Sequence, residues 1–260
     1  MMTADRIHQQ QLLQNLNTAV IGRDLHCFES IDSTNLVARQ YAEQGAAEGT
    51  VIIAEHQSSG RGRLNRSWIS PPQSSILCSI VLYPDVMPEY LFRITMLASI
   101  AVVDALHAAT GISAGIKWPN DIYAADKKIC GILTEVDCAG GGVRFAVVGI
   151  GLNVNWSLKG TELEREATSV VDICGHTCSR QKILLELLQH LDARYSRMQD
   201  ASLQAEWQKR CMHMGRKVQI MTGQDILQGT ARGISDTGHL LLESSGAVQE
   251  IICGDLSLRW

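Results

Sequence analysis

The sequence changes character near Cys211, and this change limits the folds that the chain can adopt. Before it, short β-branched runs such as TVIIAEHQ at 50–57 alternate with two long amphipathic helical patterns, at 89–111 and 180–198. After it, five short apolar segments follow one another, separated by the turns GQD, DTGH and SSGA. Mixed strands and helices are typical of an α+β domain, and dense short strands with glycine-containing turns are typical of a small barrel.

The predicted organisation therefore has three parts. We expect an N-terminal arm at 1–22, an α+β domain at 23–211 with a central mixed sheet flanked by helices, and a small C-terminal β-barrel at 212–260. Inside the larger domain, two apolar runs flank the sequence AGGG at 139–142, which predicts a hairpin. The last predicted strand is LSLRW at 256–260.

The overall charge argues against several classes of function. The 260 residues carry a net charge of −4, whereas proteins that mainly grip nucleic acid usually have a basic surplus, so DNA is not an expected partner. The chain has no run of about 18 apolar residues, and its N-terminus is polar and has no signal core. These features predict a cytoplasmic protein without a membrane span.

The eight cysteines are scattered along the chain, several of them within apolar runs. Scattered cysteines in a cytosolic protein are usually buried free thiols. The one cluster, CGHTC at 174–178, has no second pair of ligands nearby, so no metal site is predicted there.

Arginines and glycines are concentrated in the stretch SSGRGRLNRSW at 58–68. A solvated charged turn is one interpretation, and a nucleic-acid patch is another, although no aromatic residues are interleaved with the arginines. A Walker-type phosphate loop is excluded because no Gly-Lys-Ser/Thr follows, and a dinucleotide fingerprint because the third glycine is missing.

The remaining interpretation of this stretch is a loop that closes over an anionic ligand. Guanidinium groups match phosphate oxygens in pairs, and Gly60 and Gly62 let the backbone approach a ligand closely. Ordering a loop costs about 1–2 kcal/mol per residue, and exposed ion pairs return only about 0–1 kcal/mol each. We therefore expect the loop to be mobile until a tightly held anion binds.

A second candidate feature is the run KWPND at 117–121. Lys117 ends a predicted strand beside a rigid turn, and a fixed lysine attracts a unit negative charge 4 Å away by about 4 kcal/mol at an effective dielectric near 20. Asp121 is placed to orient Lys128 or to help hold a metal. The alternative is a plain Pro-Asn-Asp turn between strands. Trp118 is expected to lie in the core.

Taken together, these motifs resemble the biotin protein ligase family. Each motif is weak alone, but six in this order are highly specific. The resemblance implies a fold like that of class II aminoacyl-tRNA synthetases and biotin ligases, in the form without an N-terminal DNA-binding domain. In order, the motifs are DSTN at 32–35, GRGRLNR at 60–66, KWPND at 117–121, KKICGIL at 127–133, GIGLNVN at 149–155 and the terminal small barrel.

The resemblance also implies an activity. The carboxylate of biotin attacks the α-phosphate of ATP to give biotinyl-5′-AMP and pyrophosphate, and a lysine of a biotin carboxyl carrier protein then takes up the biotinyl group. Mg²⁺ is expected to arrive with ATP, held mostly by phosphates and water rather than by protein ligands. Whether the chain forms a homodimer is left open.

The functional residues implied by the resemblance fall into two groups. Lys117, Arg63, Asp121 and Lys128 are expected to act in catalysis. The residues expected to bind biotin or ATP are Ser33, Thr34, Asn35, Gln57, Gly60, Arg61, Gly62, Arg63, Arg66, Trp68, Lys117, Asn120, Gly131 and Asn153.

One position departs from the pattern of the family. The loop usually reads Gly-Arg-Gly-Arg-x-Gly-Arg, and here Asn65 replaces the last glycine. Asparagine tolerates the left-handed backbone better than most residues, so a working loop is still expected. Two other functions stay open: a lipoate–protein ligase of the same superfamily, and a nucleic-acid-binding regulatory module.

Overall fold

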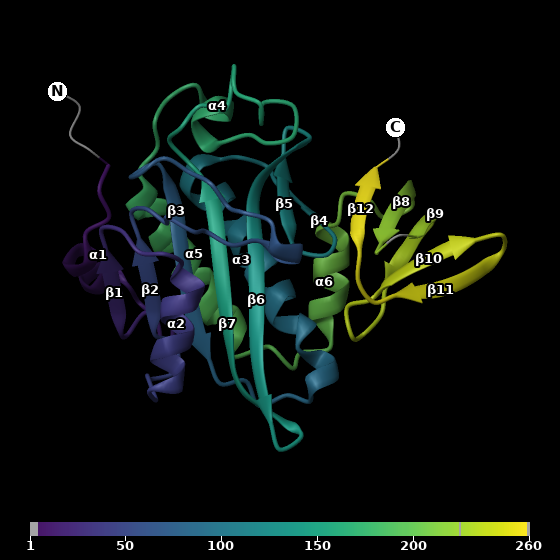
Figure 1. Cartoon of the computed structure of the whole chain (residues 1–260), viewed down its shortest axis with the longest axis horizontal. Helices are drawn as coiled ribbons and strands as arrows, with labels where there is room; N and C mark the ends of the chain where they lie inside the picture. Colours follow the sequence, from purple (N-terminus) through teal and green to yellow (C-terminus); the bar gives the residue numbers. More distant parts are fainter. Residues whose placement is uncertain (1–4, 224, 259–260) are drawn as a thin grey trace.

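Two sheets organise the chain, of which the computed structural model describes residues 5–223 and 225–258 (Figure 1). The larger sheet is mixed, because β1 and β2 are parallel and every other neighbouring pair is antiparallel. This arrangement confirms the predicted α+β class. In spatial order the seven strands are β1 (Leu25–Phe28), β2 (Val51–Ala54), β3 (Ser75–Leu82), β7 (Gly142–Asn153), β6 (Lys127–Ala139), β5 (Asp121–Ala124) and β4 (Gly115–Lys117).

Helices cover both faces of the larger sheet. Successive side chains of a strand point to opposite faces, so Ile52 packs under α2 with Ala38 and Ala42, whereas Val51 and Ile53 join the core formed with α3 and α5. The two amphipathic helices predicted from the sequence are confirmed as α3 and α5, while α4 and α6 were not predicted. The helices are α1 (Gln9–Asn15), α2 (Thr34–Glu43), α3 (Phe92–Thr110), α4 (Val170–Cys174), α5 (Arg180–Tyr195) and α6 (Ser202–Arg210).

Helix α3 lies at the centre of the main core. In the described part of the chain, the helical segment Pro88–Thr110 is the one that is long and apolar enough to cross a membrane, with a mean hydropathy of 1.6. Within its most apolar window, 67% is buried inside the protein, as is usual for a helix at the centre of a core.

The five predicted C-terminal strands are present and form an antiparallel sheet (Figure 1). The last predicted strand extends to residue 260, and residues 259 and 260 lie outside the described part, as do residues 1–4 of the predicted arm. The strands are β8 (Lys217–Thr222), β9 (Asp225–Ile234), β10 (Leu240–Ser244), β11 (Ala247–Ile251) and β12 (Asp255–Leu258).

Direct hydrogen bonds join the segment before β8 and the turn between β9 and β10 to the strand that begins the KWPND run. The backbone N–H of Met212 donates to the carbonyl of Ile116 at 3.0 Å. The indole N–H of Trp118 donates to the carbonyl of Gly238, also at 3.0 Å. Trp118 is 1% exposed, which confirms that it lies in the core. The catalytic turn predicted at 117–121 is therefore attached to both sheets.

The predicted hairpin is the longest ladder of the larger sheet, running from Cys130 opposite Leu152 to Ala139 opposite Gly142. Its open end meets the beginning of β3, where Ser75 pairs with Asn153. The loop between β2 and β3, which contains the arginines, leaves the sheet at this same end. The sequence motifs are thus gathered at one end of the larger sheet.

All eight cysteines are free. The expectation of buried thiols is correct for Cys78, Cys130 and Cys211, whereas Cys138 and Cys253 are exposed. Burial raises the pKa of Cys78 to about 12, so this thiol stays protonated near neutral pH.

Candidate active site

A cavity of about 130 Å³ opens at this end of the sheet. It brings together most of the residues that the sequence predicted for the site. Its lining includes Ser33, Thr34, Asn35, Gln57, Arg61, Gly62, Arg63, Arg66, Trp68, Asn120, Asp121, Lys128 and Gly131.

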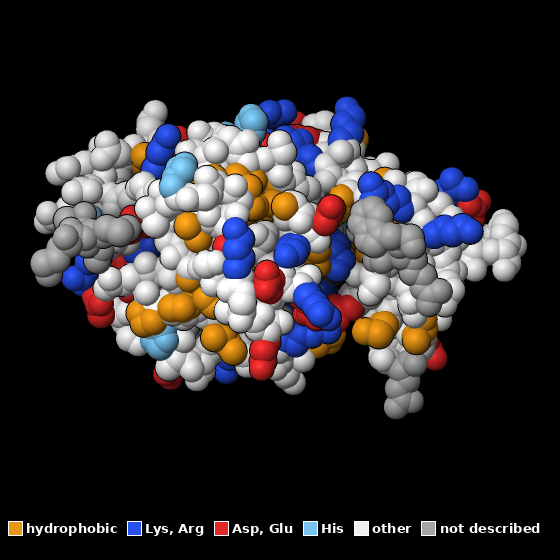
Figure 2. Space-filling view, turned by 90° about the horizontal axis from the view of Figure 1, so that it is seen from above, with side chains coloured by type: hydrophobic (Ala, Val, Ile, Leu, Met, Phe, Trp, Pro, Cys, Tyr) orange, Lys and Arg blue, Asp and Glu red, His pale blue; other side chains and the backbone are white. Residues whose placement is uncertain are grey.

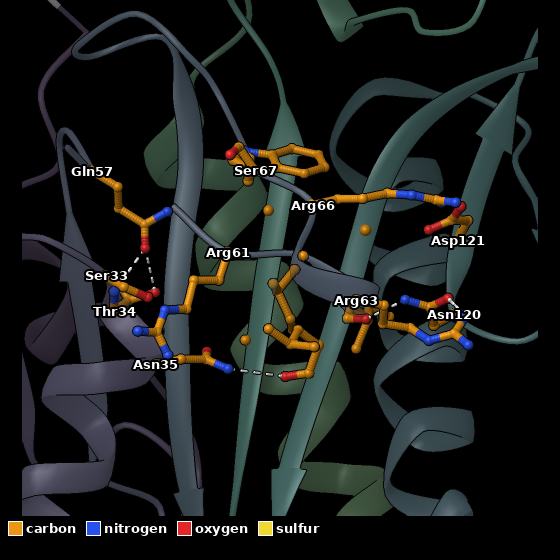
Figure 3. Close-up of a pocket in the computed structure, with 18 of the residues that line it drawn as sticks. Ser33, Thr34, Asn35, Gln57, Arg61, Arg63, Arg66, Ser67, Asn120 and Asp121 are labelled. Atoms are coloured by element: carbon orange, nitrogen blue, oxygen red, sulfur yellow. Dashed lines mark hydrogen bonds between the residues drawn. The ribbon is translucent and has the colours of Figure 1, made fainter. Parts of the chain in front are cut away.

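One side of the cavity is a chain of buried and half-buried polar side chains (Figure 3). The Oε1 atom of Gln57 accepts hydrogen bonds from the backbone N–H of Thr34 at 2.7 Å and from its hydroxyl at 3.0 Å. The Oγ atom of Ser79 lies 2.7 Å from Thr34 Oγ1 and 2.6 Å from Asn35 Oδ1. The amide of Asn35 in turn donates to Glu135 Oε2 at 2.7 Å. We call these five side chains the polar relay.

Two members of the polar relay, Ser79 and Glu135, were missed by the sequence analysis. Ser79 is fully buried in the middle of strand β3, between apolar neighbours. Glu135 lies on β6, a strand that was predicted as half of a hairpin. A polar residue within an apolar strand is a signal for a buried hydrogen-bond network, because unpaired buried polar groups are costly.

The floor of the cavity depends on Gly151. The indole of Trp68 lies so close to Gly151 that a Cβ atom there would approach Trp68 Cε2 to 2.6 Å. Real Cβ atoms do not come so near, so only glycine lets the ring lie flat on the sheet at this point. Trp68 Nε1 is buried without a hydrogen-bond partner among the described residues.

The arginine loop is folded as a tight reversal. The backbone N–H of Gly62 donates to the carbonyl oxygen of Arg66 at 2.7 Å, and the backbone N–H of Trp68 donates to the carbonyl oxygen of Gly60 at 2.9 Å. Gly60 therefore fixes the base of the loop and does not line the cavity. Asn65 has φ of 59°, which confirms the left-handed backbone expected at that position. Leu64, with φ of 54°, also has the left-handed backbone conformation, which nothing in the sequence pattern indicated.

The other side of the cavity carries ion pairs (Figure 3). Lys128 Nζ lies 2.7 Å from Asp121 Oδ1, so the predicted pairing of these residues is present. Arg63 donates to Asn120 Oδ1 at 3.0 Å and lies 3.8 Å from Asp255, and Arg66 also pairs with Asp255. Asp255 belongs to the C-terminal sheet and was missed by the sequence analysis.

Lys117 and Asn153 line a second, larger cavity of about 710 Å³, which shares Arg66, Trp68 and Lys128 with the first. Lys117 Nζ donates to the hydroxyl of Tyr123 at 2.9 Å. Asn153 donates to the carbonyl of Thr168 at 3.1 Å, and its Oδ1 atom is buried without a partner among the described residues. The two cavities form one continuous site with a polar end and a cationic end.

Seen from above, basic side chains gather with acidic ones near the centre of this face, beside the C-terminal sheet (Figure 2). The lining of the first cavity includes four cations, Arg61, Arg63, Arg66 and Lys128, and two carboxylates. In residues 5–223 and 225–258, no cluster of three His, Cys, Asp or Glu side chains could hold a metal ion. With more cations than carboxylates in its lining, the site suits an anionic ligand.

Two family models match the sequence. Residues 27–155 match the biotin/lipoate A/B protein ligase family, and residues 213–259 match the biotin protein ligase C-terminal domain. The first match covers the polar relay, Lys117 and Lys128, and the second covers the sheet that supplies Asp255. Fold and site together define a ligase of the biotin/lipoate class.

Individual relatives narrow this class. The chain is 33% identical over 270 residues to the biotin–[acetyl-CoA-carboxylase] ligase of Mycobacterium tuberculosis, with 98% of each chain covered. It is also 33% identical to the bifunctional ligase/repressor BirA of Bacillus spizizenii, covering 97% of this chain and 79% of that one. The biotin protein ligase of Aquifex aeolicus in complex with biotin and ATP has a TM-score of 0.78 at 29% identity, covering 91% of this chain and 99% of that one. The chain belongs to the biotin protein ligase family.

Proposed function

We propose that the protein is an ATP-dependent biotin–protein ligase that forms biotinyl-5′-AMP and transfers biotin to a lysine of a biotin carboxyl carrier protein. The observation that carries the proposal is the arrangement of the site. A buried polar relay faces a group of lysines and arginines across one continuous cavity. A ligand with a neutral polar head and an acidic tail fits this arrangement, and the tail then lies beside the cations.

In the first step, a biotin carboxylate oxygen attacks the α-phosphorus of ATP, and the bond between the α-phosphorus and the bridging oxygen breaks to release pyrophosphate. Negative charge builds up on the phosphoryl oxygens in the transition state. Fixed cations that meet this charge without rearranging are a large source of rate enhancement. Lys117, Lys128 and Arg63 are proposed to supply them.

The polar relay is proposed to hold the head of biotin. Ser33, Thr34 and Asn35 are 2–4% exposed, and they lie at the start of α2 with Gln57 opposite. The donors and acceptors of Thr34, Asn35 and Gln57 are already oriented within the polar relay, so binding requires little reordering. Arg61, Gly62 and Arg66 are proposed to close over the bound ligand, with Trp68 and Gly131 beneath it.

The nucleotide is proposed to occupy the larger cavity, where Asn120 and Asn153 lie. Bound Mg²⁺ would neutralise phosphate charge there, and Asp121 is the carboxylate closest to the catalytic lysine Lys128. Because the described residues include no cluster of three metal ligands, we propose that phosphates and water complete the coordination of the ion.

In the second step, the lysine amine of the acceptor attacks the acyl carbon of the adenylate, and the bond from that carbon to the phosphate oxygen breaks to release AMP. A protein substrate has to reach the mouth of the cavity. Three exposed apolar side chains line the larger cavity, namely Ile69, Leu163 and Met221, with exposures of 71%, 41% and 46%. They are proposed to contact the carrier protein.

Two further expectations remain as proposals. We place the working protein in the cytoplasm, which the eight free cysteines support. We also keep the division into an arm at 1–22, a catalytic domain at 23–211 and a C-terminal domain at 212–260.

The direct test is pyrophosphate release. With biotin, ATP and Mg²⁺, the purified protein should release pyrophosphate, and omission of biotin should abolish the release. Folded protein that releases none would reject the ligase assignment and favour a binding module, whose sign would be salt-sensitive DNA binding without nucleotide turnover.

A lipoate–protein ligase is the second candidate, because the family model covers both activities. The polar relay favours biotin, since the ring system of biotin carries a polar ureido group. Calorimetry should therefore give much tighter binding of biotin than of lipoate. An equal or reversed preference would favour the lipoate activity.

A further inference from the structure

A single carboxylate of the C-terminal sheet holds two arginines of the loop. Asp255 pairs with Arg66 through Oδ2, and its Oδ1 atom lies 3.8 Å from Nη1 of Arg63. The neighbouring carbonyl of Gly254 accepts a hydrogen bond from Nη2 of Arg63 at 3.4 Å. The C-terminal sheet thus presents several oxygen atoms to the two guanidinium groups.

The position of this carboxylate is fixed by the sheet. Asp255 begins β12, where it pairs with Met221 of β8. Its side chain is only 21% exposed, whereas that of Arg66 is 62% exposed. The acid is therefore held in place, and the arginine is the partner that can move.

Asp255 also lies inside the proposed substrate site, because it lines both cavities. A carboxylate and a phosphate present similar oxygens to a guanidinium fork, so they compete for the same donors. A triphosphate that enters the site meets two arginines already paired with an anion. It also meets the negative charge of that anion.

We propose that Asp255 stands in for a substrate phosphate group and releases Arg63 and Arg66 to the triphosphate when ATP binds. The inference rests on the proposed function, and it adds a residue that sets the affinity for the nucleotide. Before ATP binds, the pairing limits repulsion between the arginines and gives the loop partial order over the site. When ATP binds, the arginines exchange one anion for another, and the additional contacts to the substrates complete the ordering of the loop.

The exchange makes Asp255 a competitor of ATP, which gives a distinctive expectation. In Asp255→Asn the shape is kept and the charge is lost, so ATP with Mg²⁺ and without biotin should bind about threefold to tenfold more tightly by calorimetry. The affinity for biotin alone should change less than about twofold. The affinity for ATP should also fall more steeply with salt, because the freed arginines add uncompensated positive charge.

Two variants serve as controls. Asp225→Asn removes the same charge from the same sheet, at an exposed position at the start of β9, and should leave ATP affinity unchanged. Asp255→Glu keeps the carboxylate and should bring ATP affinity back towards that of the wild type. Unchanged or weaker binding of ATP to folded Asp255→Asn would overturn the proposal, since a residue that merely orients the arginines would weaken binding when altered.

Hydrogen exchange separates this inference from the proposed function. Without any ligand, amides at 61–67 should exchange faster in Asp255→Asn than in the wild type, and unchanged exchange would refute the pairing role. If the wild type releases no pyrophosphate with biotin and ATP, the ligase assignment fails, and the exchange result still decides whether Asp255 holds the loop.

Discussion

On one side of the cavity, Thr34, Asn35 and Ser79 are almost sealed from solvent and hydrogen-bonded to one another, whereas on the other side Arg66 projects into solvent and pairs with an acid from a different sheet. The first side lies on α2 and on strands of the larger sheet. The second side lies on a loop, a turn and the edge of the C-terminal sheet. Both sides contribute to one cavity.

The difference fits what each side of the cavity is proposed to bind. A neutral polar head gains from donors and acceptors that are fixed in advance, because its binding energy is modest and is easily lost to reordering. A polyphosphate brings several charges, and bare cations waiting for it would repel one another. Cations that are paired with a carboxylate before the nucleotide binds do not repel one another, and they can then exchange the carboxylate for a phosphate.

The largest effect should come from the cationic side. Lys117→Ala should lower the rate of adenylate formation by about 100-fold to 1,000-fold, as loss of a fixed donor to developing charge does elsewhere. Biotin affinity should fall much less, because the charge matters most in the transition state. Single-turnover kinetics and calorimetry measure the two quantities. Lys127→Ala, at the start of β6 where the amine donates to the carbonyl of Glu164, is the matched control.

An equal loss of biotin affinity and adenylation rate in Lys117→Ala would make this lysine a simple binding group. The division of the site into a binding side and a catalytic side would then fail.

Next in size, Ser79→Ala should weaken biotin binding by about 10-fold to 100-fold. The change removes the hydroxyl that contacts Thr34 Oγ1 and Asn35 Oδ1, and an unsatisfied buried group costs about 1–3 kcal/mol. ATP binding without biotin should not change. Ser99→Ala removes a fully buried hydroxyl from α3, where it donates to a carbonyl at 2.6 Å, and separates general destabilisation from the effect on the relay. Biotin affinity that falls equally in both variants would contradict a preformed relay.

A third test concerns the core beneath the cationic side. His213 is fully buried, and burial first, then the charges of Lys117 and Arg216, lower its pKa to about 3. The unfolded chain has a histidine pKa near 6.5, so between these values the unfolded state binds the extra proton. The free energy of unfolding should therefore fall by about 2 kcal/mol between pH 7 and pH 5 through this group.

His213→Leu should remove that part of the pH dependence and leave stability above pH 7 equal or higher, because neither ring nitrogen of His213 has a hydrogen-bond partner among the described residues. Urea titrations at pH 5 and pH 7 measure the difference. Parallel pH profiles for variant and wild type would show that the imidazole does not resist protonation.

A smaller effect is expected for Arg63→Ala, which should speed the escape of biotinyl-5′-AMP by about tenfold. The loop then loses its contact to Asn120 and the proposed contact to the phosphate. Arg144→Ala at the far end of β7, paired with Asp137, is the control. Adenylate dissociation in a chase experiment supplies the rate, and an unchanged rate would remove the closing role of the loop.

The smallest effect should appear in the second step. Ile69→Ser removes an exposed apolar side chain from the mouth of the cavity and should raise KM for the carrier protein by about threefold to tenfold. Adenylate formation should not change. Equal KM values for the wild type and Ile69→Ser would show that the carrier protein contacts a different part of the surface.

The two sides also differ in how far the sequence predicted them. Motif residues such as Thr34, Gln57 and Lys128 were found because short runs place them at strand and helix ends. Ser79 and Glu135 were not found, because they belong to strands that read as plain apolar or hairpin segments. Their role arises only when β3 and β6 come to lie near α2.

Asp255 was out of reach of the sequence analysis for a related reason. It lies 189 residues from Arg66, and its carboxylate meets the loop only because the C-terminal sheet docks against the KWPND strand. The fold class and the five C-terminal strands followed from periodicity and turn residues. The short helices α4 and α6 did not, since α4 is only five residues long and α6 contains few apolar residues at helical spacing.

The most direct measurement is hydrogen exchange at residues 60–68 and 33–35, with no ligand and with biotin plus ATP. The account predicts that amides of the arginine loop become strongly protected when both substrates are present, while those at the start of α2 are protected already and change little. Loop amides that exchange identically in both conditions would contradict a cationic side that closes on its ligand.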